Sequence, residues 1–292
     1  MSRFLELALE PSAWQRVRSW PLHRTVATVF GTGMATLVVG VYVASVLKVL
    51  PHDPDAMDLG AVNALPSAAH LLGTDFVGRD LLSRIMVGTQ AFFLPGLLSV
   101  SVSLLFGSLL GVLAGFWPAR FDTVVGLLLQ LLESLPKLVL ILLVVALFRA
   151  DIYLILLVVG ITNIPAAAEL LRARIAVLRR KSYIEAAIAL GLPPSRVILK
   201  HVLWLHGRGL VLIQATIGMG EAILIETSLS YLGFGVQEPT PSWGNMVALG
   251  KDYFFRGELW LSTVPAGAIL LTVLGFHLLG DALLERLEAS GA

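Results

Sequence analysis

Acidic side chains interrupt the long apolar stretches of this sequence, and they are its first candidates for chemistry. Glu133, Glu221 and Glu226 each stand within an otherwise apolar run. A charge at membrane depth is costly, so it usually faces a bundle interior or water and often marks an ion or substrate path. In such a path an acid can bind an ammonium group or a cation. A hydrogen bond between helices explains the same residues, and the sequence leaves both interpretations open.

Two further polar residues at membrane depth are better explained by packing. Glu169 shortly precedes Arg172 and Arg174, and this arrangement predicts an ion pair at the membrane boundary. His277 stands alone in the last apolar run. We expect it to pack between helices rather than to bind a metal.

A polar stretch from Lys181 to Gly191 lies between long apolar runs and is rich in small residues. Read as one helix, residues 175–190 gather small or apolar side chains on one side at helical spacing, namely Ala176, Tyr183, Ala186, Ala187 and Leu190. Small side chains let another backbone approach closely, so the helix around Glu185 is a candidate docking element. Gly191 permits a helix C-cap, and the two prolines at 193–194 prevent continuation. A solvated connection between two spans is the alternative.

The sequence excludes several kinds of chemistry. It contains no cysteine, which rules out disulfides and thiol catalysis. A phosphate-binding loop requires G-x-x-x-x-G-K-[ST], and the nearest stretch, 244–252, has the wrong spacing and no hydroxyl. No Ser/His/Asp set or zinc-ligand spacing stands out. Residues 73–80 can be read as an acidic metal site, but a tight turn with Arg79 paired locally explains them better. We therefore expect no catalysis, no cofactor, no bound metal and no nucleic-acid partner.

Composition and the length of the apolar runs identify the class of protein. Of the 292 residues, 57% are hydrophobic and 14% are charged, whereas an ordinary soluble domain is about a quarter charged. Runs of about 20 residues match the length needed to cross the hydrocarbon core of a bilayer. The sequence predicts an all-α integral membrane protein with six transmembrane helices at 25–47, 89–117, 123–148, 152–171, 209–232 and 261–284. Pro136 is predicted to kink the third.

The charged residues predict how the chain is oriented in the lipid bilayer. Basic residues gather at the N-terminus and between the fourth and fifth spans, where the latter group is Arg172, Arg174, Arg179, Arg180, Lys181, Arg196, Lys200 and Arg208. Acidic residues dominate the loop after the first span, with Asp53, Asp55, Asp58, Asp75 and Asp80. Positive residues stay on the cytoplasmic side. Both termini and the loop at about 172–208 are therefore predicted to be cytoplasmic, while 51–84 and 233–260 face outward.

Several motifs, in order along the chain, resemble one transporter family. Glu185-Ala186-Ala187-x-x-x-Gly191, followed by Ile198-Leu199, is similar to the EAA motif of permease subunits of ABC importers. The stretch HLLGTDFVGRDLLSR at 70–84 looks like the signature before the second helix of dipeptide, oligopeptide and nickel permeases. Residues 229–246 are similar to that family's outer loop, and FHLLGD at 276–281 resembles the end of its last helix. The resemblance covers nearly the whole chain and implies the smaller of two permeases.

The resemblance implies a type I ABC importer permease fold. The expected organisation is an N-terminal segment with the first helix and an external stretch at 1–85, then a transmembrane permease domain at 86–292. The implied function is translocation of di- or oligopeptides across the inner membrane by alternating access, without ATPase activity in this subunit. Import of nickel or another small solute is the alternative. On the residues alone, an ion-coupled secondary transporter with Glu221 or Glu226 as proton relay is the rival, although no internal repeat is evident.

The resemblance also implies partners and contact residues. Expected partners are a homologous second permease, two ATP-binding cassette subunits that hydrolyse ATP, and an external substrate-binding protein. The ATPase would dock on the loop that carries Tyr183, Glu185, Ala186, Ala187 and Gly191. Trp243 and Asn245 fall in the outer loop, which suits either an amphipathic plug at the membrane boundary or a docking surface for the binding protein.

Three positions depart from the family pattern. Trp204 stands where a proline usually follows in the docking loop, Gln130 replaces an acid six residues before Pro136, and Glu221 replaces a small residue.

Overall fold

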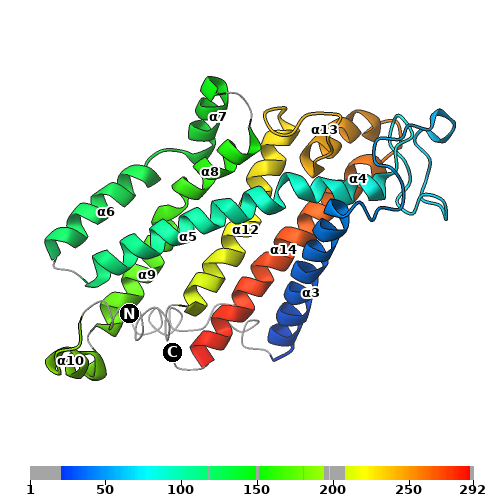
Figure 1. Cartoon of the computed structure of the whole chain (residues 1–292). Coiled ribbons are helices and arrows are strands. Elements are labelled where there is room, and N and C mark those ends of the chain that lie inside the picture. Colours follow the sequence, from blue (N-terminus) through cyan, green and yellow to red (C-terminus); the bar gives the residue numbers. More distant parts are fainter. Residues whose placement is uncertain are drawn as a thin grey trace, which may run out of the picture.

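The structure, a computed structural model, describes residues 21–116, 119–148, 151–179, 181–193, 197 and 208–289. Across these ranges the regular elements are helices, joined by loops, and no β-strand is formed. The longest helices are α3 (Pro21–Val46), α5 (Phe93–Phe116), α12 (Arg208–Tyr231) and α14 (Trp260–Ala289). They run side by side through the body of the molecule, with α5 crossing obliquely (Figure 1).

The number of spans agrees with the prediction. Five helical segments are long and apolar enough to cross a membrane, and a sixth span results when α6 (Ala119–Glu133) and α7 (Lys137–Phe148) are taken together. These two helices meet at an angle of 70°. Pro136 lies in the break between them, so the predicted kink is confirmed. The all-α membrane fold is confirmed as well.

A second span is also discontinuous. Helix α8 (Ile152–Thr162) ends at Asn163, and α9 (Ile164–Leu178) begins immediately after it, with Pro165 in its first turn. Proline suits the start of a helix because its missing N–H would have no partner there. The span therefore continues to Leu178, beyond the predicted end at 171, because Leu171, Ile175 and Leu178 are all buried.

Small residues allow the central helices to approach closely. Helix α5 packs along α9, α12 packs along α14, and α14 packs along α3. A Cβ at Gly107 would lie 2.6 Å from the Cβ of Ala167, and one at Gly160 would lie 2.6 Å from the carbonyl oxygen of Ser99. Close backbone contact through glycine and alanine is the usual way in which membrane helices associate.

The two ends of the bundle carry different structures. Helix α13 (Trp243–Phe254), the short α4 (Leu81–Gly88) and the segment at 47–80 form one end (Figure 1). Helix α10 (Ser182–Ala189) lies at the opposite end, together with the start of α3 and the end of α14 (Figure 1). The helix α13 was not predicted within the outer loop. Its signal was present as Ser242 and Asn245, which form a capping box at its N-terminus.

The single helix predicted at 175–190 is wrong. Helix α9 ends at Leu178 and α10 starts at Ser182. The break lets Ile184 turn back into one apolar cluster with Ile175 and Leu178. A continuous helix would carry Ile184 about 13 Å along the axis from Ile175, at 1.5 Å per residue, and would leave it outside this core. The burial of Ile184 therefore favours two helices with a break over one continuous helix.

Candidate functional site

A charged pair lies near the middle of the membrane-spanning region. The Nζ atom of Lys137 is 2.7 Å from Oε1 of Glu221, and it also donates to Oδ1 of Asn163 at 2.6 Å. The side chains of Lys137 and Glu221 keep 40% and 33% of their surface exposed. Their exposed part cannot face lipid at low free energy, because hydrocarbon offers a charge no hydrogen bonds. This pair therefore faces water or another protein subunit.

Lys137 and Asn163 each lie where a membrane span is interrupted, and Glu221 lies near the middle of another span. Lys137 is the first residue of α7, directly after the bend at Pro136. Asn163 is the junction of α8 and α9. Glu221 lies near the middle of the span Gly209–Tyr231. Discontinuous helices that meet near the bilayer midplane are typical of the substrate sites of transporters, and we call Lys137, Asn163 and Glu221 the midplane cluster.

The other acidic candidates lie elsewhere. Glu133 ends α6 and is exposed, and no hydrogen bond or ion pair among the described residues joins it to the midplane cluster. Glu226 is completely buried and accepts a hydrogen bond from Ser230 Oγ at 2.7 Å. In this conformation Glu226 is enclosed by its own chain, whereas Glu221 is not. The two acids therefore have separate environments, although they belong to the same helix.

Arg172, a basic residue predicted to pair with Glu169, forms its ion pair with a different acid. Arg172 Nη2 donates to Oδ2 of Asp122 on α6 at 2.8 Å, and Glu169 itself is exposed. His277 lies against α12, where a Cβ on Gly220 would be 3.4 Å from its Nε2. His277 therefore contacts α12 on one side, while the residue itself is exposed.

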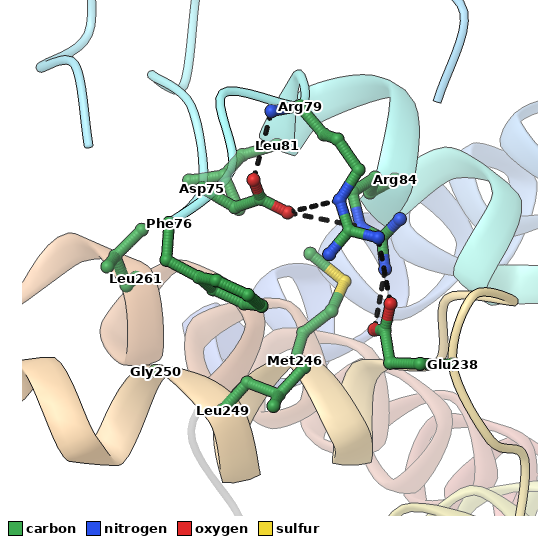
Figure 2. A pocket seen from close by; sticks show the side chains of 10 residues that line it. All are labelled: Asp75, Phe76, Arg79, Leu81, Arg84, Glu238, Met246, Leu249, Gly250 and Leu261. Carbon is green, nitrogen blue, oxygen red and sulfur yellow. Dashed lines mark hydrogen bonds and ion pairs between the residues drawn. The ribbon is translucent and has the colours of Figure 1, made fainter. Parts of the chain in front are cut away.

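An ionic network closes the end of the molecule that carries α13. Arg79 Nε lies 2.7 Å from Oδ2 of Asp75, and Arg79 Nη1 lies 2.8 Å from Oε2 of Glu238 (Figure 2). Arg84 Nη2 approaches Oε1 of the same Glu238 at 2.7 Å, and Arg84 is almost fully buried (Figure 2). Burial alone would lower the pKa of Arg79, but the bonds from Glu238 and Asp75 outweigh it and raise the pKa. The predicted local pair of Arg79 is confirmed, and Glu238 is a partner that spacing could not reveal.

Trp243 and Asn245 are buried within the same end of the molecule. The indole Nε1 of Trp243 donates to the carbonyl oxygen of Ile85 at 2.9 Å, and its ring centroid lies 4.7 Å from that of Phe92. Asn245 Nδ2 donates to the carbonyl oxygens of Val236 and Thr240. Both residues therefore fix the loop onto the bundle.

The sequence of the candidate docking helix α10 includes Tyr183, Glu185, Ala186 and Ala187. The helix is anchored by Ile184, which is completely buried. Ala186 is exposed, as is Leu190 after the helix end. Gly191 has a φ of +79° with no atom near its missing Cβ, so the left-handed conformation alone calls for glycine there. Trp204 and the later part of the loop lie outside the described residues.

Comparison with known proteins identifies the family. Residues 107–290 match the family described as the binding-protein-dependent transport system inner membrane component. The chain is 38% identical over 237 residues to the probable D,D-dipeptide transport system permease protein of Escherichia coli (strain K12), covering 81% of this chain and 79% of that protein. It is 34% identical to the dipeptide transport system permease protein of Alkalihalophilus pseudofirmus, covering 76% and 73% of the two chains.

A third relative covers almost the whole chain. The glutathione transport system permease protein of Pectobacterium atrosepticum is 33% identical over 276 residues, which are 94% of this chain and 89% of that protein. The residues that match the family, 107–290, span the midplane cluster, α10 and the stretch 229–246. The chain belongs to the inner-membrane permease components of binding-protein-dependent ABC transport systems.

Proposed function

We propose that this permease carries peptides across the inner membrane and that the midplane cluster lines their path. The relatives are named for transport of dipeptides and glutathione, which share a peptide backbone with charged groups at both ends. The observation that carries the proposal is the half-exposed pair of Lys137 and Glu221 at membrane depth. When the pair opens, Glu221 offers a carboxylate to a peptide ammonium and Lys137 offers an ammonium to a peptide carboxylate.

In the proposed assembly, partner subunits enclose the path, hydrolyse ATP and deliver the peptide. A homologous second permease faces the midplane cluster, so that the path runs between the two subunits and stays away from lipid. This sequence has no phosphate-binding loop, so the ATP is hydrolysed by partner subunits. Two ATP-binding cassette subunits dock at the end with α10. An external binding protein delivers the peptide at the end with α13. The excess of basic residues at 172–208 supports a cytoplasmic position for α10 and both termini in this proposal.

The docking helix has a direct mechanical connection to the midplane cluster. Ile184 of α10 packs in one core with Ile175 and Leu178 near the end of α9. The opposite end of α9 adjoins Asn163, which accepts a hydrogen bond from Lys137. A movement of α10 on ATP binding is therefore transmitted along α9 to the residues that line the path. We assign these parts to the permease domain at 86–292, while 1–85 contributes α3 and the external segment.

The proposal is tested by uptake of a labelled dipeptide into proteoliposomes that contain both permeases and the ATPase subunits, with the loaded binding protein added outside. We expect uptake that requires ATP inside and stops when ATP hydrolysis is blocked. Uptake that persists without ATPase subunits and follows a proton gradient would identify a secondary transporter instead. Uptake of Ni²⁺ but of no peptide would reassign the substrate and leave the permease assignment intact.

A further inference from the structure

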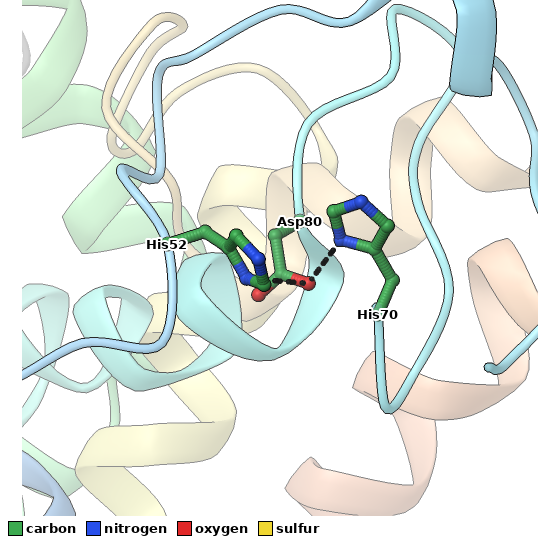
Figure 3. A group of neighbouring side chains, drawn as sticks. All are labelled: His52, His70 and Asp80. Atoms are coloured by element: carbon green, nitrogen blue, oxygen red, sulfur yellow. Dashed lines mark hydrogen bonds and ion pairs between the residues drawn. The ribbon is translucent and has the colours of Figure 1, made fainter. Parts of the chain in front are cut away.

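Two imidazoles converge on one carboxylate at the outer end of the molecule. His52 and His70 both point at Asp80, and their ring centroids are 4.7 Å apart (Figure 3). The Nδ1 atom of His70 lies 2.9 Å from Oδ1 of Asp80, and that of His52 lies 3.6 Å from the same oxygen. One ligand atom from each of the three residues lies within 4.8 Å of the other two. The second imidazole thus faces a carboxylate oxygen that already has a hydrogen-bond partner.

The carboxylate is held in this orientation by Ser83. The other oxygen of Asp80, Oδ2, accepts hydrogen bonds from the backbone N–H of Ser83 at 2.8 Å and from its hydroxyl at 2.7 Å. The same hydroxyl oxygen accepts the backbone N–H of His52 at 3.0 Å. One serine therefore aims Oδ1 at the two rings and ties the His52 backbone beside it. Outer residues that orient the ligands in this way are characteristic of metal sites.

The geometry points to a divalent transition metal of the zinc class, and we propose that His52, His70 and Asp80 bind such an ion. Bonds of about 2.0–2.1 Å at tetrahedral angles place neighbouring ligand atoms about 3.3 Å apart. The two nitrogen–oxygen separations, 2.9 and 3.6 Å, lie on either side of that value. Two imidazoles and one carboxylate suit Zn²⁺, Ni²⁺ or Co²⁺ rather than Mg²⁺ or Ca²⁺. A water molecule would complete the four ligands.

The site is accessible from the outside. His52 borders a cavity of about 500 Å³ that is also lined by Asp53 and Asp55, with Lys48 as the cation on its wall. The side chain of His52 is 43% exposed, whereas Asp80 is 2% exposed. An ion that enters this cavity therefore meets His52 together with two acidic groups. Sequence spacing does not reveal the site, because the ligands are 28 and 10 residues from Asp80 along the chain.

Metal binding would join three separate segments. His52 follows α3, His70 belongs to the loop at 62–80, and Asp80 caps the N-terminus of α4. An ion that binds the folded chain stabilises it by mass action. The proposed role of the metal is to stabilise the packing of the outer segment on the bundle. This role does not depend on the peptide substrate proposed above.

The test is metal binding by the purified full chain, prepared without a histidine tag and stripped with a chelator. Zn²⁺ is added, and bound metal is measured by elemental analysis after gel filtration. We expect one Zn²⁺ per chain, a higher Tm with Zn²⁺, and a visible spectrum of tetrahedral Co²⁺ when Co²⁺ replaces it. His52→Ala should weaken binding at least about tenfold and abolish the Tm shift, while the Tm without metal stays unchanged because His52 is partly exposed.

His277→Asn is the matched control, because it removes another exposed histidine far along the chain. This variant should bind Zn²⁺ as the wild type does. The proposal is overturned if the wild type retains no Zn²⁺, or if His52→Ala retains the wild-type amount and affinity. Equal losses in the two variants would also overturn it, since they would indicate non-specific binding by surface histidines.

Discussion

Lys137 and Glu221 are separated by 84 residues along the chain, and yet their Nζ and Oε1 atoms lie 2.7 Å apart. Apolar packing also joins the two helices, because Ile141 and Val145 of α7 share one buried cluster with Ala222, Ile225 and Leu229 of α12. The ion pair adjoins this cluster, since Glu221 directly precedes Ala222 in the chain. The pair keeps part of its surface exposed, so it can open toward a solute while the apolar cluster holds the helices together.

The two charges should behave differently when they are removed singly and together. Glu221→Gln or Lys137→Gln leaves one charge at membrane depth, where a charge costs about 2.5–3.5 kcal/mol on insertion scales, and partial exposure of the pair lowers that cost. We expect each single variant to lower the Tm, and we expect the double variant to recover it. Peptide uptake should fall in all three, because the charges bind the peptide termini.

Uptake that recovers together with the Tm in the double variant would reduce the pair to a structural role. The readouts are thermal unfolding in detergent and initial uptake rates in proteoliposomes.

Glu238 should matter far more for stability than Asp55, an exposed acid near Arg84. Glu238→Gln removes the countercharge that Arg79 and Arg84 share, and leaving such buried donors poorly matched costs about 1–3 kcal/mol. Asp55→Asn is the control, because Asp55 is 62% exposed and 3.6 Å from Arg84, and a surface pair contributes about 0–1 kcal/mol. Equal shifts in Tm for the two variants would contradict the network in Figure 2.

Two substitutions at Trp243 separate its hydrogen bond from its packing. Trp243→Phe loses the bond to the carbonyl oxygen of Ile85 and should cost about 0.5–1.5 kcal/mol. Trp243→Ala also empties the space beside Phe92 and should cost about 3–5 kcal/mol. Both are measured by thermal unfolding of the purified chain. If Trp243→Ala were neutral, the tryptophan would not anchor the outer loop.

Gly191, at the end of the docking helix, can be tested against Gly257 as a control, because the two glycines have the same backbone requirement. Both have a positive φ, +79° and +90°, and neither has an atom within 4 Å of its missing Cβ. Alanine should therefore add similar strain at each, about 1–2 kcal/mol. We expect Gly191→Ala to reduce ATP-driven uptake and retention of the ATPase during purification, because the end of α10 shifts.

Gly257→Ala, at the opposite end of the bundle, should lower the Tm to a similar extent and leave the ATPase bound. A Gly191→Ala variant that couples normally would remove α10 from the proposed contact with the ATPase.

Much of the fold was predictable because it depends on local patterns. The lengths of the apolar runs gave six spans, and Pro136 gave the bend between α6 and α7. The left-handed Gly191 and the local pair of Arg79 with Asp75 also follow from nearby residues. The capping residues Ser242 and Asn245 contained the signal for α13, which a reading of this segment as a loop overlooked.

The rest depends on residues that meet only in the folded chain. Glu238 reaches Arg79 across 159 residues, and no periodicity encodes such a meeting. The break between α9 and α10 was missed for a related reason. Helical spacing at 175–190 satisfies a continuous helix, but the burial of Ile184 against α9 favours a turn. In the same way, the sequence marked Glu221 as unusual without identifying Lys137 as its partner.

The measurement that tests the central claim most directly is the accessibility of position 221 to a charged, membrane-impermeant thiol reagent in the assembled transporter. The chain has no cysteine of its own, so Glu221→Cys is its sole thiol once the partner subunits are made cysteine-free. Leu37→Cys, near the middle of α3 and 57% exposed to the surroundings, is the control that faces lipid. The account predicts that position 221 reacts, that position 37 does not, and that peptide-loaded binding protein with ATP changes the rate at position 221. A position 221 that stays as unreactive as position 37 in every nucleotide state would contradict a peptide path through Lys137 and Glu221.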